Sequence, residues 1–317
     1  MANIYSETDE SACRRLWEEN IAPEQLTDLW DIRACFHQQF KRRFFFVVAQ
    51  EAGKTVGLIP LSFIEEHNYY GYFPGEVWEG KTWLEQNRLI AQDPNVLQQM
   101  FEWLRGQKIP YHLRYLCPTP HLSFDLTNED EIGYLFYPGS FQFNMEEYYA
   151  TFSKKTLKKI RREVDRLYAR NLVIRTDDSN DFEEMLILSI ERFGTHSYFA
   201  NNQFVKSFRA LKDYLHQKGW LKMTAVIIDG RIAAVDMGCL YNGNYKLLAG
   251  GTHGDYPGVA KAINLHHMQE ACTNRYKEAD FLCGDFSWKK LFHLTPRPLY
   301  VVSNMVSGVL TSSPAHS

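Results

Sequence analysis

Two dipeptides, Asp229-Gly230 and Asn242-Gly243, constrain the fold of this 317-residue chain more than any other feature. They separate three runs rich in β-branched and aromatic residues, which cover residues 220–228, 231–241 and 244–252. Asp-Gly and Asn-Gly readily adopt the positive backbone angles that a two-residue hairpin turn needs. The three runs are therefore predicted to form a meander of consecutive antiparallel strands.

Two helices are predicted between a strand over residues 172–176 and this meander. The first begins near Asn180, which with Glu183 resembles a capping box. Its apolar stripe has helical spacing and consists of Phe182, Met185, Leu186, Ile190 and Phe193. The second carries apolar residues from Phe204 to Leu215 and ends at Gly219. Both helices should lie on the sheet through their apolar sides.

After the meander, a glycine-rich turn leads into a helix over residues 259–276, a strand over 280–283, a short helix over 287–293 and a strand over 299–303. The first half suggests helices over 10–20, after Pro23, over 82–91 and over 94–106. A hairpin over 44–48 and 56–64 lies among them, and strands are predicted at 111–117, 122–126 and 133–137. The length favours two domains, over residues 1–145 and 146–317.

Composition excludes several classes of protein. Hydrophobic residues make up 45% and charged residues 23% of the chain, as in globular proteins. A net charge of -3 gives no general attraction to DNA. No stretch reaches the roughly 18 apolar residues that cross a bilayer, and the N-terminus has no apolar signal region, so a cytoplasmic location is expected.

No metal site is predicted. The six cysteines include no C-x-x-C pair, so they match neither a disulfide framework nor a zinc site and are interpreted as small buried residues. His266 and His267 are adjacent and face different directions, unlike the two histidines of a helical metal site, which are four residues apart.

The order of elements in the second half, together with its residues, resembles the GNAT acyltransferase fold. The segments FSKKTLKKIRREVDRLYARNLVI, GRIAAVDMGCLYNGNYKLLAGGTHGDYPGVAKAINLHHMQEA and ADFLCGDFSWKK are similar to an acyltransferase family. That family is typified by cellulose-biosynthesis proteins and related to the Fem-type aminoacyltransferases of peptidoglycan synthesis. The resemblance covers about residues 148 to 303. It implies an α/β (α+β) fold of tandem GNAT-like domains, the first of them degenerate, each with a mixed, mostly antiparallel sheet flanked by helices.

The resemblance implies transfer of an acyl group from an acyl-CoA or acyl-carrier thioester to an amine. In this fold the loop and first helical turn after the meander bind the pyrophosphate of the donor through backbone amides. The residues at these positions are Gly258, Val259, Ala260 and Lys261, and Gly250, Gly251 and Gly254 before them allow close backbone approach. Asp255 stands where the coenzyme A signature has Gln or Arg, which leaves the carrier open. A glycine-rich turn before an ordinary helix is the alternative interpretation.

Amine acylation needs a base for the proton of the amine and hydrogen-bond donors for the carbonyl oxygen. Asp285 and His253 are candidate bases because both lie at strand ends that the GNAT fold brings together. Asp285 could instead cap the next helix, and His253 could be a polar loop residue. Lys289 could hold a substrate anion or pair with Asp285. Asp236, in an otherwise apolar strand, is a site residue or a structural hydrogen bonder.

A strongly basic helix over residues 154–170 precedes the domain. Its apolar stripe leaves most of its eight Lys and Arg residues on the other sides. They form either a solvated face or a site for the phosphates of a donor, a sugar-nucleotide acceptor or a charged tRNA, with Lys158 and Arg162 as candidate ligands.

The acceptor site is assigned to the segment NYYGYFPGEVWEGKTWLEQN (residues 68–87), whose composition suits flat polar ligands and equally suits packing between domains. Trp83, Glu85 and Asn87 are the candidates. The family resemblance implies an amino sugar for a surface polysaccharide. A Fem-like aminoacyl-tRNA-dependent transferase is the main alternative, although residues 204–218 leave no room for the helical arm of many Fem-type enzymes. A non-catalytic ligand-binding protein with this fold is the third.

Overall fold

The meander predicted from the two turn dipeptides forms as three antiparallel strands, β9 (Leu221–Ile228), β10 (Arg231–Tyr241) and β11 (Asn244–Thr252). Asp229 and Asn242 have φ values of 49° and 51°, as two-residue hairpin turns require. The ladder pairs Arg231 with Ile228 and Tyr241 with Asn244, directly beside the two turns. This part of the fold confirms the prediction.

The structure is a computed structural model that describes residues 2–118, 128–284 and 286–305. The described residues divide into two compact units: one runs from Gly133 to Arg297, and the other contains the residues before and after it. Compact units need not coincide with functional domains, so the predicted domains 1–145 and 146–317 stay a prediction. Among the described residues, no helix combines the length and apolar character that crossing a bilayer requires.

The second unit is built on a mixed sheet. Its strands follow the order β7 (Asn128–Phe136), β12 (Glu278–Asp280), β11, β10, β9 and β8 (Val173–Thr176). β11 and β12 are parallel, whereas β12 with β7, β11 with β10, β10 with β9 and β9 with β8 are antiparallel. β13 (Thr295–Ser303) and β7 each run from one unit into the other. The sequence predicts a strand over 280–283, whereas β12 covers residues 278–280. The strand thus lies two to three residues earlier in the chain than predicted.

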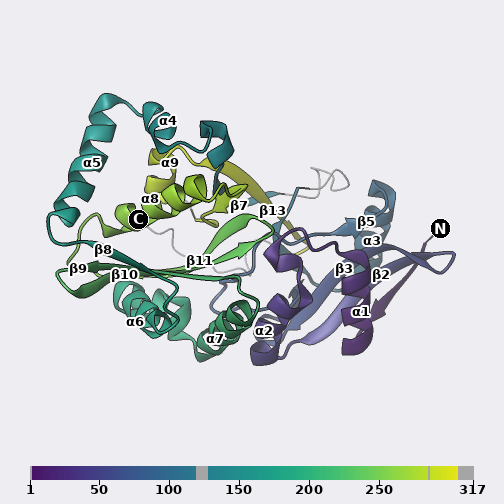
Figure 1. The fold of residues 1–317 in the computed structure, drawn as a ribbon. Helices are drawn as coiled ribbons and strands as arrows, with labels where there is room; N and C mark the ends of the chain where they lie inside the picture. Colours follow the sequence, from purple (N-terminus) through teal and green to yellow (C-terminus); the bar gives the residue numbers. More distant parts are fainter. Residues whose placement is uncertain (1, 119–127, 285, 306–317) are drawn as a thin grey trace. The chain divides into compact units, whose positions relative to one another are not determined.

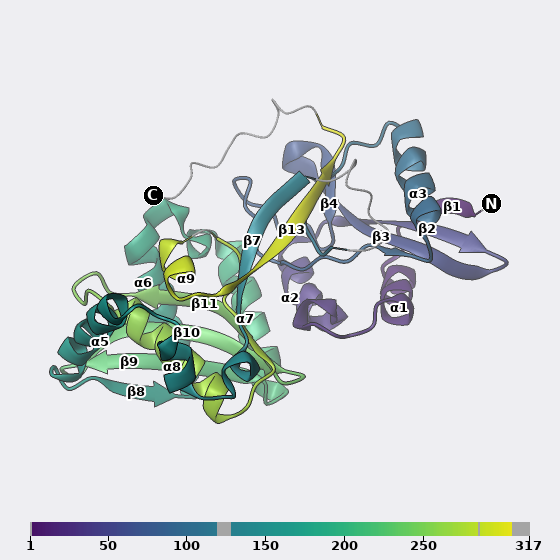
Figure 2. The ribbon, with the colours of Figure 1, turned by 90° about the horizontal axis from the view of Figure 1, so that it is seen from above.

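Helices cover both faces of this sheet. α6 (Asp181–Phe193) and α7 (Asn202–Gln217) lie on one face, and α5 (Lys154–Tyr168) and α8 (Val259–Thr273) lie on the other (Figures 1 and 2). α4 (Met145–Ala150) and α9 (Ser287–Leu291) are short. An apolar cluster joins α5, α8 and the strands through Leu167, Val226, Ala234, Tyr256 and Ile263, among others. The order of elements predicted for residues 154–303 is confirmed.

α6 departs from its predicted details. Asn180 forms no side-chain cap, so the predicted capping box is wrong. Ile190 and Phe193 are 40% and 47% exposed, so the predicted stripe is wrong in the last turn of the helix. Leu188 packs against β11 instead, because Gly251 has no side chain: a Cβ at Gly251 would lie 2.7 Å from the Cβ of Leu188. Because α6 and β11 approach each other closely at Gly251, the buried face of α6 is rotated toward Leu188 relative to the predicted stripe.

The first unit has a sheet in the order β1 (Asn3–Glu7), β2 (Arg43–Glu51), β3 (Lys54–Ile64) and β4 (Tyr69–Tyr72), with β5 (Ile90–Ala91) also paired to β3. Its helices are α1 (Glu10–Asn20), α2 (Trp30–Phe40) and α3 (Pro94–Gly106). β6 (His112–Leu116) pairs antiparallel with the end of β13. Single-turn 3-10 helices are η1 (Leu26–Asp28), η2 (Glu65–His67), η4 (Pro138–Phe141), η5 (Gly194–His196) and η6 (Tyr198–Ala200).

The hairpin and the helices over 10–20 and 94–106 are confirmed, whereas two other predictions for this half are wrong. The second helix begins at Trp30 rather than after Pro23. Residues 82–91 form no helix, because the Glu76 carboxylate accepts the backbone N–H groups of Trp83 and Leu84 and holds the chain extended. The predicted strand at 122–126 lies outside the described residues.

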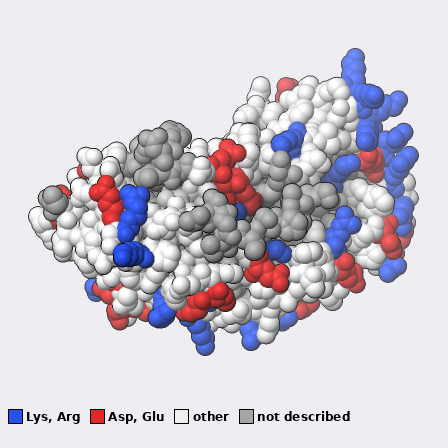
Figure 3. Space-filling model, turned by 180° about the vertical axis from the view of Figure 1, so that it is seen from behind, with Lys and Arg blue, Asp and Glu red and all other residues white. Residues whose placement is uncertain are grey.

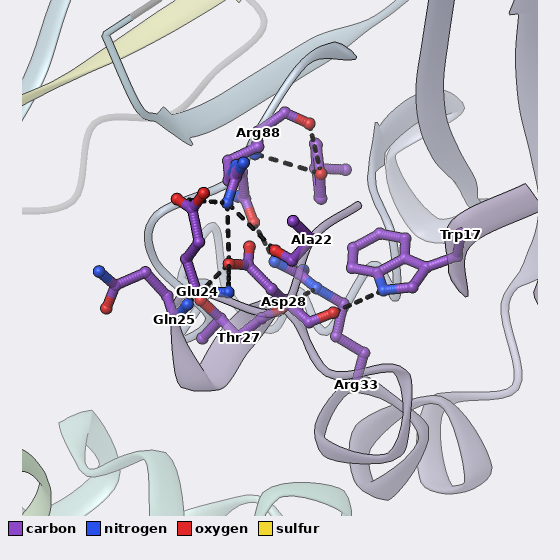
Figure 4. A network of polar contacts seen from close by, with 10 residues as sticks. Trp17, Ala22, Glu24, Gln25, Thr27, Asp28, Arg33 and Arg88 are labelled. Atoms are coloured by element: carbon purple, nitrogen blue, oxygen red, sulfur yellow. Dashed lines mark hydrogen bonds and ion pairs between the residues drawn. The ribbon is translucent and has the colours of Figure 1, made fainter. Parts of the chain in front are cut away.

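A polar network fixes the turn between α1 and α2 (Figure 4). The Asp28 carboxylate accepts two backbone N–H groups of this turn and pairs with Arg88 at 3.0 Å. The Trp17 indole donates to the Asp28 carbonyl at 2.7 Å, and buried Arg33 donates to the Thr27 carbonyl at 2.7 Å. Buried polar groups are stable only when paired, so these bonds define one path for the chain here.

Candidate functional site

The sheet of the second unit opens between β11 and β12. The two strands pair only over Asn244–Lys246 and Glu278–Asp280, although β11 continues to Thr252. A bulge at Leu248 further disrupts the ladder between β10 and β11. Within the described part of the chain, residues 247–252 therefore have a paired strand on one side only. Backbone amides of residues 249–252 on the open side of such a strand are available to a ligand, whereas Leu248 has a contact of its own.

The N-terminus of α8 lies at the end of the loop that follows this strand. Gly258 precedes the helix with φ 94°, and no side chain caps it. The Gly258 carbonyl accepts the N–H groups of Lys261 and Ala262. No acceptor for the N–H of Ala260 is found among the described residues. A helix end with free amides and a positive dipole is suited to an anion.

The other residues predicted for donor binding have packing roles as well. Val259 is buried in the cluster below α8, and the Lys261 ammonium pairs with Glu163 of α5. A Cβ at Gly250 would lie 2.1 Å from Oδ1 of Asp236, and Gly251 lies against α6. Because even one added carbon is too large at these glycines, both are needed for packing, whatever their role toward a donor.

Asp236 belongs to a buried hydrogen-bond network. Its Oδ2 lies 2.9 Å from Nε2 of His267 on α8, and Nδ1 of His267 lies 3.1 Å from the hydroxyl of Tyr245 on β11. Asp236 is 5% exposed and His267 is 3% exposed. With a proton on Nε2 and a lone pair on Nδ1, His267 donates to Asp236 and accepts from Tyr245, so all three groups are satisfied. Burial, followed by the charge of Asp236, raises the pKa of Tyr245 well above its usual value.

Sequence reasoning found Asp236 but missed its two partners. The signal for Asp236 was a carboxylate in an apolar strand, which requires a partner once the strand is buried. In the sequence, His267 stands out only as half of an adjacent histidine pair, and its direction on α8 depends on how that helix packs. Nothing in the sequence distinguishes Tyr245 from the other residues of its strand.

His253 and Lys289, two candidate catalytic residues, make local contacts. Nδ1 of His253 accepts the backbone N–H of Asp255 at 3.2 Å, within the loop before α8. The ammonium of Lys289 is buried and donates to the carbonyls of Leu282 at 2.9 Å and Cys283 at 2.8 Å. These contacts hold the loops at the ends of β11 and β12.

The remaining candidate base, Asp285, lies outside the described residues. Its role and the pairing of Lys289 with it stay predictions. Asp236 lies against Gly250 on the neighbouring strand. His253 bonds within the loop before α8, and Lys289 of α9 bonds to the segment after β12.

The basic helix is confirmed as α5, and its charged side faces solvent. Figure 3 shows Lys and Arg side chains gathered over it. Arg161 pairs with Glu146 and Arg170 with Asp229. On α5, the exposed Lys and Arg side chains that form no ion pair with the described residues are Lys154, Lys155, Lys158, Lys159, Arg162 and Arg166. Four of them, 154, 158, 162 and 166, recur every four residues, or about every 6 Å along a helix.

The acceptor candidates Trp83, Glu85 and Asn87 are buried within the first unit. The side chain of Asn87 accepts from Arg33 at 2.8 Å and donates to the Arg114 carbonyl at 2.8 Å. The Trp83 ring stacks on Phe36 with 5.3 Å between centroids. These contacts give Trp83 and Asn87 structural roles, and an acceptor role for the three stays a prediction.

Among the described residues, no group of three His, Cys, Asp or Glu side chains could hold a metal ion. Cys239 and Cys13 are buried, and burial raises the pKa of each thiol to about 12. A thiol of that pKa is protonated near neutral pH, so neither cysteine is a ready nucleophile.

Comparisons with known proteins agree with this geometry. Residues 154–290 match the family model described as an acetyltransferase (GNAT) domain. No curated protein sequence matches the chain.

Solved structures match almost the whole chain at low identity. The C-terminal domain of a putative lysylphosphatidylglycerol synthetase from Agrobacterium fabrum has a TM-score of 0.58 at 10% identity, covering 95% of each chain. FemX has a TM-score of 0.57 at 10% identity, covering 95% of this chain and 97% of that one. A tandem GNAT protein from the clavulanic acid biosynthesis pathway has a TM-score of 0.52 at 9% identity, covering 97% and 100%.

The class follows from these findings. The chain has the tandem GNAT fold, with mixed sheets flanked by helices, and residues 154–290 match the model of an acetyltransferase (GNAT) domain. The open side of β11 and the free N-terminus of α8 lie inside the matched residues. Likeness at this level of identity defines the fold and leaves the substrates to chemical argument.

Proposed function

We propose that this protein is an N-acyltransferase that moves an acyl group from an acyl-CoA or acyl-carrier thioester to an amine. One observation carries the proposal: the gap between β11 and β12 is followed directly by the free N-terminus of α8. A thioester carrier linked through phosphates needs both features, amides for its acyl and amide groups and a helix end for its phosphates.

In the proposed reaction, the neutral amine attacks the thioester carbonyl, a C–N bond forms, the C–S bond breaks so that the carrier leaves as its thiolate, and one proton leaves the amine. Amides on the open side of β11 stabilise the carbonyl oxygen as it becomes negative. We assign the proton to Asp236, which lies against Gly250 on this strand and is held by His267. Asp285 and His253 remain the other candidate bases, from their positions in the sequence.

The acceptor proposal is an amino sugar or its nucleotide-linked form, destined for a surface polysaccharide. It rests on the similarity of residues 148–303 to acyltransferases typified by cellulose-biosynthesis proteins. Asp255 at the usual Gln or Arg position of the coenzyme A signature makes an acyl carrier protein a donor to test beside acyl-CoA.

Thermal unfolding with acetyl-CoA, longer acyl-CoAs, an acyl carrier protein and free adenosine nucleotides tests the donor. A thioester at 100 times its Kd should stabilise the folded protein by about 2.7 kcal/mol. Thiol release with glucosamine as acceptor then tests transfer. Asp236→Asn should lower kcat at least a hundredfold and keep the thermal shift caused by the donor. If no thioester stabilises the protein, the proposal is wrong.

A second candidate is an aminoacyl-tRNA-dependent transferase of the Fem type. The row of unpaired cations on α5 favours it, because their spacing of about 6 Å is close to the distance between successive phosphates in a nucleic-acid strand. Salt-sensitive binding of charged tRNA, in the absence of any thermal shift with thioesters, would select this candidate. Binding of neither donor class would leave the third, a non-catalytic protein with this fold.

A further inference from the structure

A small polar cavity lies on the α8 side of the sheet in the second unit. It is lined by Thr176, Asp177, Lys222, Met223, Thr224, Tyr245, His266, His267, Glu270 and Tyr276. Its floor is formed by β9 and β11, one wall by α8, and its rim by the end of β8. We propose that this cavity binds the ammonium group of a small primary amine, as a second ligand site beside the transfer site.

The cavity is distinct from the end of α8 assigned to the donor phosphates. His266 and Glu270 are seven and eleven residues beyond Val259. At 1.5 Å per residue they are about 10 and 16 Å along the helix from its N-terminus. The proposal therefore goes beyond the acyltransferase function and does not depend on it.

The polar atoms of the cavity are mainly hydrogen-bond acceptors. Thr224 is 5% exposed, and its hydroxyl has no hydrogen-bond partner in the described part of the chain. Nε2 of His266 is buried and lacks a partner there as well. Burial, followed by the neighbouring His267, lowers the pKa of His266, so the ring is neutral near pH 7 and one nitrogen can accept. When the proton of His267 is on Nε2, the Tyr245 hydroxyl donates to Nδ1 of His267 and its oxygen can accept from a ligand.

The charge around the cavity favours a cation over an anion. Asp177 and Glu270 contribute two carboxylates, and the single lysine, Lys222, is paired with Asp177 at 3.3 Å. Glu270 is left as the uncompensated charge, apart from a hydrogen bond from Asn274. An ammonium group offers three donors and one positive charge, which matches an acceptor-lined cavity of net negative charge.

The size and the acceptor lining of the cavity favour a small ligand with N–H donors. Its volume is about 60 Å³, where one water needs roughly 10–15 Å³ by the same measure. A methylammonium ion fits this space, whereas a tetraalkylammonium offers no N–H donor to the acceptors. The rings of Tyr245 and Tyr276, with centroids 6.3 Å apart and planes 13° apart, provide an aromatic surface for the carbons.

Occupancy of this cavity would act on the transfer site through a short path. A cation at the Tyr245 oxygen strengthens the bond from Tyr245 to His267, and His267 holds Asp236 beside Gly250. The structure thus connects a small-amine site to the proposed base by two hydrogen bonds.

Calorimetric titration of the full chain with methylammonium chloride tests the proposal without any transfer reaction. We expect saturable binding, no binding of tetramethylammonium, and no heat beyond dilution from sodium chloride at equal ionic strength. Glu270→Gln keeps the shape of the side chain and removes its charge. It should weaken methylammonium at least tenfold, as expected for the loss of a charged hydrogen bond.

Glu191→Gln, an exposed carboxylate on α6, is the matched control and should leave the affinity unchanged. Thr224→Val should weaken binding severalfold. If methylammonium and sodium chloride give the same response, or if Glu270→Gln binds as tightly as the parent, the proposal is overturned. Tighter binding of acetate than of methylammonium would overturn it as well. None of these results bears on transfer activity.

Discussion

At the scale of single residues, Gly250 is a position where one added carbon should destabilise the fold. Its missing side chain leaves room for Oδ1 of Asp236, which is locked by His267 and cannot move away cheaply. Gly250→Ala should therefore cost about 1–3 kcal/mol of unfolding free energy. Urea denaturation measures this. Gly254→Ala, in the adjoining loop with open space around it, should be close to neutral and serves as the control.

Lys289 gives a second prediction, which separates a structural role from a role in substrate binding. Lys289→Met removes the ammonium that holds the carbonyls of Leu282 and Cys283 but keeps most of the side-chain volume. We expect a loss of about 1.5–3 kcal/mol in urea denaturation. Lys206→Met, on the exposed side of α7, is the control. A large rise in KM at unchanged stability would support substrate binding instead.

At this scale, the sequence shows which residue types can take part in chemistry better than it shows which residues contact one another. Asp236 could be selected because a carboxylate in a buried strand is costly without a partner. That the partner is His267, 31 residues away in the sequence, depends on the rotation of α8. The role of Gly251 depends in the same way on the close approach of α6, which no local pattern records.

At the scale of elements, apolar periodicity and turn residues predict those helices and strands that interactions between residues near in sequence determine. The Asp-Gly and Asn-Gly turns fix the meander because few residues other than Asn, Asp and Gly tolerate positive φ. Residues 82–91 contain apolar residues at helical spacing, yet Glu76 draws the amides of Trp83 and Leu84 into another conformation. A tertiary hydrogen bond outweighs a weak helix propensity there.

α5 carries a prediction about polyanions. Lys158→Gln with Arg162→Gln removes two exposed cations from the row of unpaired charges. If α5 contacts phosphates, a single-stranded RNA oligonucleotide should bind more weakly to this variant, and the slope of log K against log salt should fall by about 1.4. Fluorescence anisotropy at several salt concentrations measures both. Lys206→Gln with Lys218→Gln removes two cations at α7, and an equal loss in this control would show that only net charge matters.

At the scale of the whole molecule, three histidines link stability to pH. Burial lowers the pKa of His37, His112 and His266, that of His112 to about 4. Between pH 6.5 and about 4 the unfolded chain therefore binds more protons than the folded one, so stability falls as pH falls. His112 alone accounts for up to about 3 kcal/mol.

Urea denaturation between pH 7.5 and 4.5 measures this effect. His112→Leu should flatten the dependence on pH, and the titration of the His112 imidazole by NMR provides a check that does not need the variant. A stability that is constant from pH 7 to pH 5 would contradict the prediction.

The pairing of β6 with β13 imposes an order on biosynthesis. Leu116 pairs with Tyr300, and the whole second unit is encoded between them. At roughly 5–20 residues per second, the ribosome delivers the partner of β6 about ten to forty seconds after β6 itself. During that interval β6 is a strand without its neighbour. The second unit, by contrast, is complete as soon as Arg297 emerges, so the later part of the chain can reach its native state before the earlier part does.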